Sequence, residues 1–227
     1  MTRIIQGVFD FQRRVFGGKR ELFEQLGSGQ RPLALFITCS DSRVNPNLLT
    51  QTEPGELFVL RNAGNLVPPD GSPPSGEAAT IEYAVHHLHV RDLILCGHSQ
   101  CGAMQGLITP GAADGMPAVA NWLAYAQESV ARAQAINPRA GRGQLLQSVI
   151  EQNVLLQIEH VKSYPLVREA VTAGKLRLHA WCYGFESGDV TAFDAQTNRF
   201  VPLAPPDMKK MLVPLEPIEQ APADRNM

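Results

Sequence analysis

Long apolar runs, an excess of charge of one sign and a large number of cysteines are all missing from this sequence of 227 residues. The longest apolar runs, 33–37 and 93–96, fall far short of the roughly 20 residues that a membrane-spanning helix requires, so we expect no membrane span. Lys and Arg number 20 against 22 Asp and Glu, and the formal net charge is −2. This balance argues against a nucleic-acid-binding protein, which would carry a basic stripe.

A secretory signal is also missing from the first residues, because no apolar core is followed there by the small residues of a cleavage site. We therefore expect a cytoplasmic protein in a reducing compartment. The sequence contains only four cysteines. In such a compartment, metal binding, catalysis or burial explains them better than a disulfide framework.

Compact apolar runs of the β type alternate with helical stretches along most of the chain. The β-type runs cover 33–38, 56–60, 92–97 and 176–183. Helices are predicted at 76–88, 144–163 and 165–173, and after Asn45, a capping residue followed by Pro46. This alternation is typical of an α/β fold with a mostly parallel β-sheet flanked by helices.

Two segments outside this alternation complete the predicted organisation. Apolar residues recur at helical spacing in 2–26, and Gly17-Gly18 divides them into two short helices, so residues 1–28 are predicted to form an N-terminal helical arm. Six of the 17 prolines follow Phe200, which predicts a loose, proline-rich C-terminal tail at 204–227. The domain that carries the function is expected at 29–203.

Three of the predicted strands end in residues that carry chemistry. Cys39, Asp41 and Arg43 follow the first strand, Arg-Asn-Ala-Gly-Asn at 61–65 follows the second, and Gly-His-Ser-Gln-Cys-Gly at 97–102 follows the third. Open parallel sheets bind ligands at the carboxyl ends of their strands. We therefore expect the three segments to line one site.

Cys39, His98 and Cys101 provide two thiolates and one imidazole, a set that suits Zn²⁺ and leaves a fourth position for water or substrate. The His-x-x-Cys spacing lets one turn present two of these ligands, and a helix that begins at Cys101 would stabilise its thiolate. Buried core thiols and a loop histidine are the alternative for each residue taken singly. Three such ligands at converging strand ends favour the metal site.

Asp41 and Arg43 are close enough in sequence to form a bidentate ion pair beside this metal site. A local turn, in which Asp41 accepts hydrogen bonds from nearby backbone N–H groups, is the alternative. Next to a zinc ligand we favour the ion pair. Arg43 would then keep the carboxylate of Asp41 charged and oriented toward the metal's open position.

The residues at these strand ends resemble a known family, the β-class carbonic anhydrases. The motifs are Cys-Ser-Asp-Ser-Arg at 39–43, Pro-Gly-Glu-Leu-Phe-Val-x-Arg-Asn-Ala-Gly-Asn at 54–65 and Gly-His-Ser-x-Cys-Gly-Ala at 97–103. The resemblance spans residues 29–188. Within the family the sequence is most similar to the cyanobacterial carboxysomal enzymes, through residues 10–12, 22–26, 61–66 and 98–104.

The resemblance implies a zinc enzyme that reversibly hydrates carbon dioxide to bicarbonate and a proton through zinc-bound hydroxide. It implies zinc on Cys39, His98 and Cys101, and a catalytic dyad of Asp41 and Arg43. It also assigns substrate-binding roles to five residues. Gln30 would form a hydrogen bond with the substrate, the apolar walls of the pocket would consist of Phe58, Ala63 and Tyr83, and Gly102 would allow a close approach beside the pocket.

The resemblance further implies a homodimer or a dimer-based higher oligomer, in which the N-terminal arm wraps a neighbouring chain and both chains contribute to the pocket. One departure concerns regulation. Some bacterial members have an inhibitory bicarbonate site formed by a Trp, an Arg and a Tyr, and here Arg61 and Tyr183 match but Phe36 replaces the Trp. We do not expect that regulation in this chain.

Several alternatives stay open at the level of sequence. His86, His87 and His89 form either a second metal site or, as we favour, a solvated polar patch. The His-x-Glu and Pro-Cys-x-x-Cys motifs of zinc deaminases do not occur. A location inside a carboxysome, with a carboxysome scaffold protein as partner, stays open beside the free cytoplasmic one. Two other functions also stay open: a non-catalytic zinc-binding scaffold of the carboxysome, and a hydrolase of carbon disulfide or carbonyl sulfide on the same fold.

Overall fold

The structure is a computed structural model that describes residues 1–204 of the chain. The tail predicted at 204–227 lies, apart from its first residue, outside the described residues. Within them, no helix is long and apolar enough to span a membrane.

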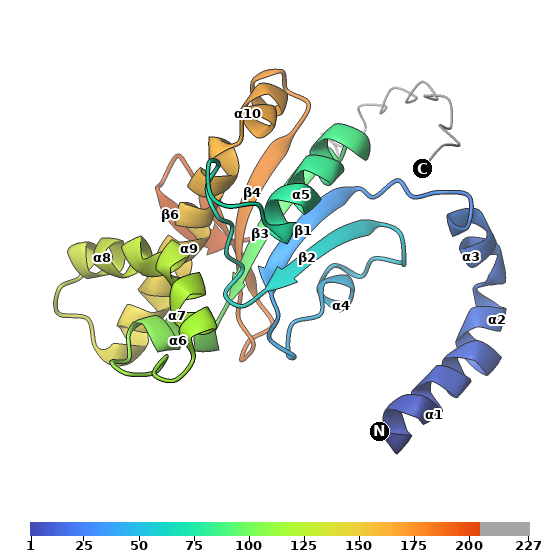
Figure 1. The fold of residues 1–227 in the computed structure, drawn as a ribbon, viewed down its shortest axis with the longest axis horizontal. Helices are drawn as coiled ribbons and strands as arrows, with labels where there is room; N and C mark the ends of the chain where they lie inside the picture. Colours follow the sequence, from blue (N-terminus) through green and yellow to red (C-terminus); the bar gives the residue numbers. More distant parts are fainter. Residues whose placement is uncertain (205–227) are drawn as a thin grey trace.

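A six-stranded sheet forms the centre of the molecule, with β2 at one edge and β6 at the other (Figure 1). The strand order is β2-β1-β3-β4-β5-β6, and β1 to β4 run parallel while β5 and β6 join as antiparallel strands. The strands are β1 (Ala34–Cys39), β2 (Leu57–Asn62), β3 (Asp92–His98), β4 (Arg177–Tyr183), β5 (Val190–Asp194) and β6 (Arg199–Pro202). The predicted mostly parallel sheet is confirmed.

Both faces of the central strands are covered, as is typical of parallel strands that helical crossovers connect. Leu35 and Ile37 of β1 face a core that includes much of the long helix α9 (Arg142–Ser163). Phe36 and Ile94 face a smaller cluster on the other side, against Leu49 of the short helix α4 (Pro46–Thr50). All six residues of β1 are buried, which makes this strand the centre of the fold.

The path of the chain creates a switch point between β1 and β3. From β1 the chain passes through α4 to β2 on one side of β1, and then returns through α5 (Gly76–Glu82) to β3 on the other side. Loops that leave adjacent strands in opposite directions open a crevice at the carboxyl ends. Cys39 and His98 are the last residues of these two strands.

The remaining helices lie before β1 and between β3 and β4. The arm contains α1 (Thr2–Asp10), a π-helical turn (Phe11–Val15), α2 (Phe16–Gly18) and α3 (Arg20–Leu26). A second π-helical turn (Tyr83–His87) extends α5. The β3–β4 connection contains α6 (Gly102–Leu107), α7 (Pro117–Leu123), a 3₁₀ turn (Ala124–Ala126), α8 (Gln127–Ile136), α9 and α10 (Pro165–Thr172).

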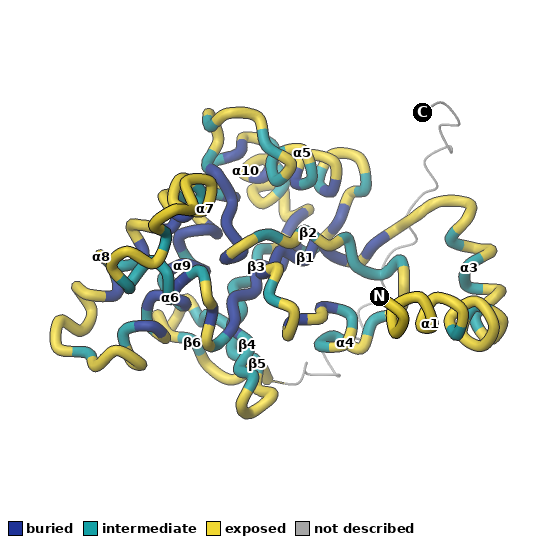
Figure 2. The backbone as a smooth tube through the Cα atoms, turned by 60° about the horizontal axis from the view of Figure 1, so that its bottom comes forward, coloured by how far each residue is buried: buried dark blue, intermediate teal, exposed yellow. Residues whose placement is uncertain are grey.

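The N-terminal arm extends away from the sheet, as the dark blue helices of Figure 1 show. Its surface is almost entirely exposed (Figure 2). An ion pair between Lys19 and Glu53 connects it to the body of the molecule. The predicted division of the arm into two helical segments is confirmed, with the break at Lys19, one residue after Gly18, where the backbone has φ −121° and ψ 22°.

The β5–β6 hairpin was not predicted from the sequence. The residues of β5 are partly buried and most of those of β6 are exposed, in contrast to those of β1 and β3. The strands are short, and a half-buried edge pattern gives a weak sequence signal. Pairing of β5 with the end of β4 at Tyr183 and Val190 explains why these residues are extended.

Candidate metal centre

Two strand ends and one helix start place the three candidate metal ligands together. Cys39 ends β1, His98 ends β3, and Cys101 precedes the first residue of α6. The Sγ atoms of the two cysteines and an imidazole nitrogen of His98 lie within 4.8 Å of one another, and all three residues are buried. In residues 1–204 this is the one cluster of three or more His, Cys, Asp or Glu side chains that could hold a metal ion.

Two glycines allow the close packing around this cluster. Gly64, with φ +83°, donates its N–H to Cys39 Sγ at 3.3 Å. A Cβ at position 97 would lie only 2.7 Å from Val154 Cγ2, so the absence of a side chain lets α9 pack directly on β3 beside His98. A side chain at either glycine would displace a ligand-bearing segment.

The imidazole of His98 is oriented for metal binding. Its Nδ1 lies 2.8 Å from the carbonyl oxygen of Ser99, which can only accept, so Nδ1 carries the proton. Its Nε2 is buried and has no hydrogen-bond partner among residues 1–204. A histidine whose Nδ1–H is held by a carbonyl and whose Nε2 is bare is the usual arrangement of a zinc ligand.

The thiols of Cys39 and Cys101 shift each other's pKa. A hydrogen bond from the Cys101 thiol, together with one from the Gly64 N–H, lowers the pKa of Cys39 to about 4 although burial opposes the shift. The same shared proton, together with burial, raises the pKa of Cys101. A cation would replace that proton and let both thiolates exist, so the donor set fits a zinc ion with an open fourth position.

Asp41 and Arg43 form the bidentate ion pair expected beside the ligands. Arg43 Nε donates to Asp41 Oδ1 at 2.9 Å and Arg43 Nη2 donates to Oδ2 at 2.8 Å. These hydrogen bonds hold the pKa of Asp41 well below its ordinary value, so its carboxylate stays charged. Asp41 Oδ2 also lies 3.9 Å from His98 Nε2, which places the carboxylate next to the cluster.

Other residues that support the centre had not been assigned this role from the sequence. Arg61 donates from Nε to the carbonyl oxygen of Cys39 at 3.1 Å and from Nη2 to that of Asp41 at 2.8 Å. Its position in the Arg-Asn-Ala-Gly-Asn segment was the available signal. Arg43 lies next to Phe185, with Cζ 4.4 Å from the ring centroid, and no sequence motif indicated this contact.

The predicted pocket residues fall into two groups. Ala63 and Gly102 adjoin the centre, since Ala63 precedes Gly64 and Gly102 follows Cys101. Phe58 is paired with Leu35, whereas Asn62 is paired with Cys39, so Phe58 lies four residues, or roughly 13 Å, along β2 from the ligand end.

Tyr83 lies with Phe58, and Gln30 lies before the amino end of β1, whereas the candidate ligand Cys39 ends that strand. The rings of Tyr83 and Phe58 are 5.8 Å apart. His86, His87 and His89 are exposed and do not join a three-ligand cluster. Their interpretation as a polar patch is therefore favoured over a second metal site.

Comparison with known proteins identifies the family. A family model described as carbonic anhydrase matches residues 34–190. A solved structure of the β-carbonic anhydrase CcaA is 41% identical, with a TM-score of 0.87, and covers 89% of this chain and 99% of its own. The chain belongs to the β-class carbonic anhydrases.

The relatives of this carbonic anhydrase are similar over most of its length. A carbonic anhydrase of Pseudomonas aeruginosa is 46% identical over 204 residues, which cover 90% of this chain and 92% of the relative. A carbonic anhydrase of Synechococcus elongatus is 46% identical over 193 residues, which cover 84% of this chain and 70% of the relative. The predicted enzyme class is thus confirmed.

Proposed function

We propose that the chain catalyses the reversible hydration of carbon dioxide to bicarbonate and a proton, with one zinc ion held by Cys39, His98 and Cys101. The observation that carries the proposal is the bare, buried Nε2 of His98, which faces two thiols and lies 3.9 Å from a carboxylate held by arginine. A closed structural zinc site would not need that carboxylate.

The bound zinc would lower the pKa of a water molecule and so supply a nucleophile. Because two thiolates offset the charge of the metal, we expect that nucleophile at a more alkaline pH than at a zinc ion held by three histidines. Asp41 provides a charged hydrogen-bond acceptor beside the open position, which orients a donor there. Arg43 keeps that carboxylate ionised and fixes both of its oxygens. Arg61 holds the loop between Cys39 and Asp41 through the two carbonyl groups, so the acceptor and the ligand keep a constant separation.

The substrate pocket is proposed to contain Gln30, Phe58, Ala63, Tyr83 and Gly102. Because Phe58 and Tyr83 lie away from the ligands of their own chain, we propose that a second copy brings them to the centre. The functional unit would then be a homodimer or a dimer-based higher oligomer. The exposed arm supports this assembly.

A cytoplasmic location is part of the proposal, whereas a carboxysomal one has no separate support. The Pseudomonas aeruginosa and Synechococcus elongatus relatives are both 46% identical to the chain. Overall identity therefore does not favour the cyanobacterial carboxysomal type or a carboxysome scaffold protein as partner. A non-catalytic scaffold role would also not explain the Asp41–Arg43 ion pair beside the cluster.

The test is stopped-flow hydration of carbon dioxide on protein whose zinc content per chain is measured. We expect one zinc per chain and rapid hydration in proportion to zinc. Cys39→Ser should lose most of both, whereas the matched control Cys96→Ser, at a buried thiol outside the cluster, should keep both. Full zinc occupancy without hydration, or with hydrolysis of carbon disulfide or carbonyl sulfide instead, would overturn the proposal.

A further inference from the structure

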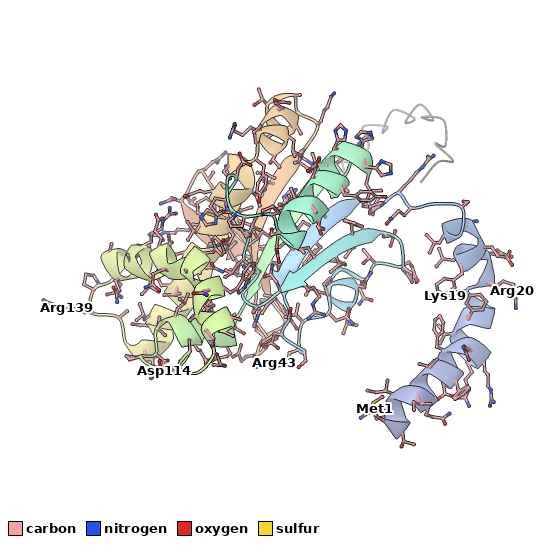
Figure 3. The ribbon with its side chains drawn as sticks, in the orientation of Figure 1. Met1, Lys19, Arg20, Arg43, Asp114 and Arg139 are labelled. Atoms are coloured by element: carbon pink, nitrogen blue, oxygen red, sulfur yellow. The ribbon has the colours of Figure 1, made fainter. Side chains whose placement is uncertain are left out.

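The ring of Phe185 lies between a metal ligand and the catalytic dyad. Phe185 follows β4, and its ring centroid is 5.0 Å from that of His98. The Arg43 guanidinium packs over the same ring with Cζ 4.4 Å from its centroid. Figure 3 labels Arg43 at this end of the sheet, beside the loop that follows β4. One half-buried side chain thus contacts both components of the centre.

Hydrogen bonds hold this ring in place from the ligand side. Ser99, the neighbour of His98, accepts a hydrogen bond on Oγ from the Phe185 N–H at 2.9 Å. The Ser99 hydroxyl in turn donates to Glu186 Oε2 at 2.9 Å, and the Ser99 N–H donates to the Tyr183 carbonyl at 2.8 Å. The loop that carries Phe185 is therefore connected to the residue next to His98 by three hydrogen bonds.

Arg43 is also held by a backbone group with an unusual conformation. Its Nη2 donates to the carbonyl oxygen of Gln100 at 3.2 Å, and Gln100 has φ +52°. A non-glycine residue in the left-handed region is uncommon, and such residues gather at functional sites. The guanidinium is thus held by the Asp41 carboxylate, the Gln100 carbonyl and the ring of Phe185.

The Asp41–Arg43 pair needs this support because the Arg43 side chain is 52% exposed. Exposed ion pairs are weak, since water competes for both partners. Asp41 Oδ2 is already 3.9 Å from His98 Nε2, so a carboxylate released from Arg43 lies close enough to rotate toward a metal ion at the cluster. Carboxylates are common zinc ligands, and such a contact would occupy the open position.

We propose that Phe185 is a positioning residue that acts through Arg43: its ring fixes the guanidinium by a cation–π contact and so keeps Asp41 paired and off the metal's open position. The inference rests on the proposed function for its catalytic consequence. A cation–π contact at a partly exposed site corresponds to a change of about three- to tenfold in the population of the paired state.

Phe185→Leu removes the aromatic face and keeps an apolar side chain, whereas Phe185→Tyr keeps the face. The matched control is Phe193→Leu, at a ring that packs against Phe200 5.6 Å away on the β5–β6 hairpin. Ser99→Ala is a second variant, which removes the hydrogen bonds from Ser99 Oγ to the loop and keeps the Phe185 ring. The test then remains possible if Phe185→Leu does not fold.

The first measurement is the rate at which phenylglyoxal modifies Arg43 in the zinc-loaded protein, followed by peptide mass spectrometry with exposed Arg139 as internal reference. We expect about three- to tenfold faster modification of Arg43 in Phe185→Leu, and faster modification in Ser99→Ala. The rates of wild type, Phe185→Tyr and Phe193→Leu should agree. Equal rates in Phe185→Leu and Phe193→Leu would overturn the proposal.

The second measurement is the visible absorption spectrum of the cobalt-substituted protein, which reports the donor atoms around the metal. Phe185→Leu should show a new ligand-field component that is absent in Phe185→Tyr and that disappears in the double variant with Asp41→Asn. An identical spectrum in Phe185→Leu and wild type would contradict the role of the ring in holding Asp41 away.

Hydration kinetics then separate this inference from the proposed function. We expect kcat of Phe185→Leu to fall with KM unchanged. Molecules in which Asp41 occupies the open position of the metal would be inactive, whereas the remaining molecules would bind and convert substrate as the wild type does. If no protein hydrates carbon dioxide but the two spectroscopic and chemical readouts change as expected, the proposed function fails and the positioning role stands. If hydration is normal in wild type and Phe185→Leu alike, the positioning role fails.

Discussion

Gly97 shows how a single missing methyl group sets the geometry of the centre. It precedes the candidate ligand His98, and its Cα faces α9 so closely that a Cβ would lie 2.7 Å from Val154 Cγ2. We expect Gly97→Ala to lose about 1–3 kcal/mol of unfolding free energy through overpacking. Zinc retention should also decrease, because β3 must shift where it carries His98. Urea unfolding and zinc analysis measure the two effects.

Two further variants test this explanation. Adding Val154→Ala to Gly97→Ala opens the space and should restore part of the zinc retention. Gly143→Ala is the control, since a Cβ at that position in α9 would meet no atom of residues 1–204 within 4 Å beyond its chain neighbours and its own helix backbone. There the better helix propensity of alanine predicts unchanged or slightly higher stability. Equal stability of Gly97→Ala and wild type would show that the contact does not constrain β3.

The sequence was informative about residues whose chemistry depends on strand ends. Cys39, His98 and Cys101 could be grouped because parallel strands bring their carboxyl ends to one edge, and the structure does bring the three side chains together. Phe185 could not be found this way. Its contacts with Arg43 and His98 depend on how the loop after β4 packs against the ends of β1 and β3. No local sequence pattern predicts this packing.

At the scale of elements, Asp92 at the start of β3 connects two neighbouring strands. It accepts hydrogen bonds from Arg177 Nε at 2.8 Å and Nη2 at 2.7 Å, and lies 2.7 Å from His179 Nε2 of β4. Although burial raises the pKa of Asp92, the hydrogen bonds from His179 and Arg177 lower it from 3.8 to about 2. The folded state therefore binds the proton more weakly than the unfolded state does.

The sign of this shift predicts an acid-dependent contribution to stability. The contribution is fully present above about pH 4, and it is lost as the pH falls toward the folded-state pKa of about 2. Asp92→Asn should therefore be less stable than wild type at neutral pH by up to about 2 kcal/mol. The difference should shrink through this acid range, which urea unfolding at a series of pH values measures. A difference that is independent of pH would refute the electrostatic explanation.

Helices and strands were predicted correctly where the apolar residues follow one clear periodicity. They were missed where the structure depends on pairing with a neighbouring strand. The long helix α9 and the buried strands β1 and β3 have clear apolar patterns, and their positions agree with the predicted ranges within two residues. The β5–β6 hairpin depends on pairing with β4 rather than on its own apolar pattern. At Gly17-Gly18, helical hydrogen bonding on both sides outweighs the low propensity of glycine, and the break moves to Lys19.

At the scale of the molecule, the N-terminal arm presents an apolar surface that residues 1–204 do not cover. Ile4 is 67% exposed and Val8 52% exposed, and Phe9 is similarly open to solvent. Helix α1 contains no buried residue. Burying such apolar surface away from water is favourable. Separately, Phe58 and Tyr83 lie away from the candidate metal ligands of their own chain. Both features are explained if a second copy receives the arm.

Charge substitutions on the arm test this assembly. Ile5→Glu combined with Val8→Glu should dissociate the oligomer, because two carboxylates would be buried at the contact, while Gln6→Glu on the same helix is the control. Light scattering should show a smaller species for the double variant, and hydration should fall at least about tenfold, since loss of a few kcal/mol of contact energy separates the chains. Zinc content should stay near one per chain, because all three ligands come from one chain. A monomeric variant with full activity would show that a single chain forms the complete site, and the proposed roles of Gln30, Phe58 and Tyr83 would then have to be abandoned.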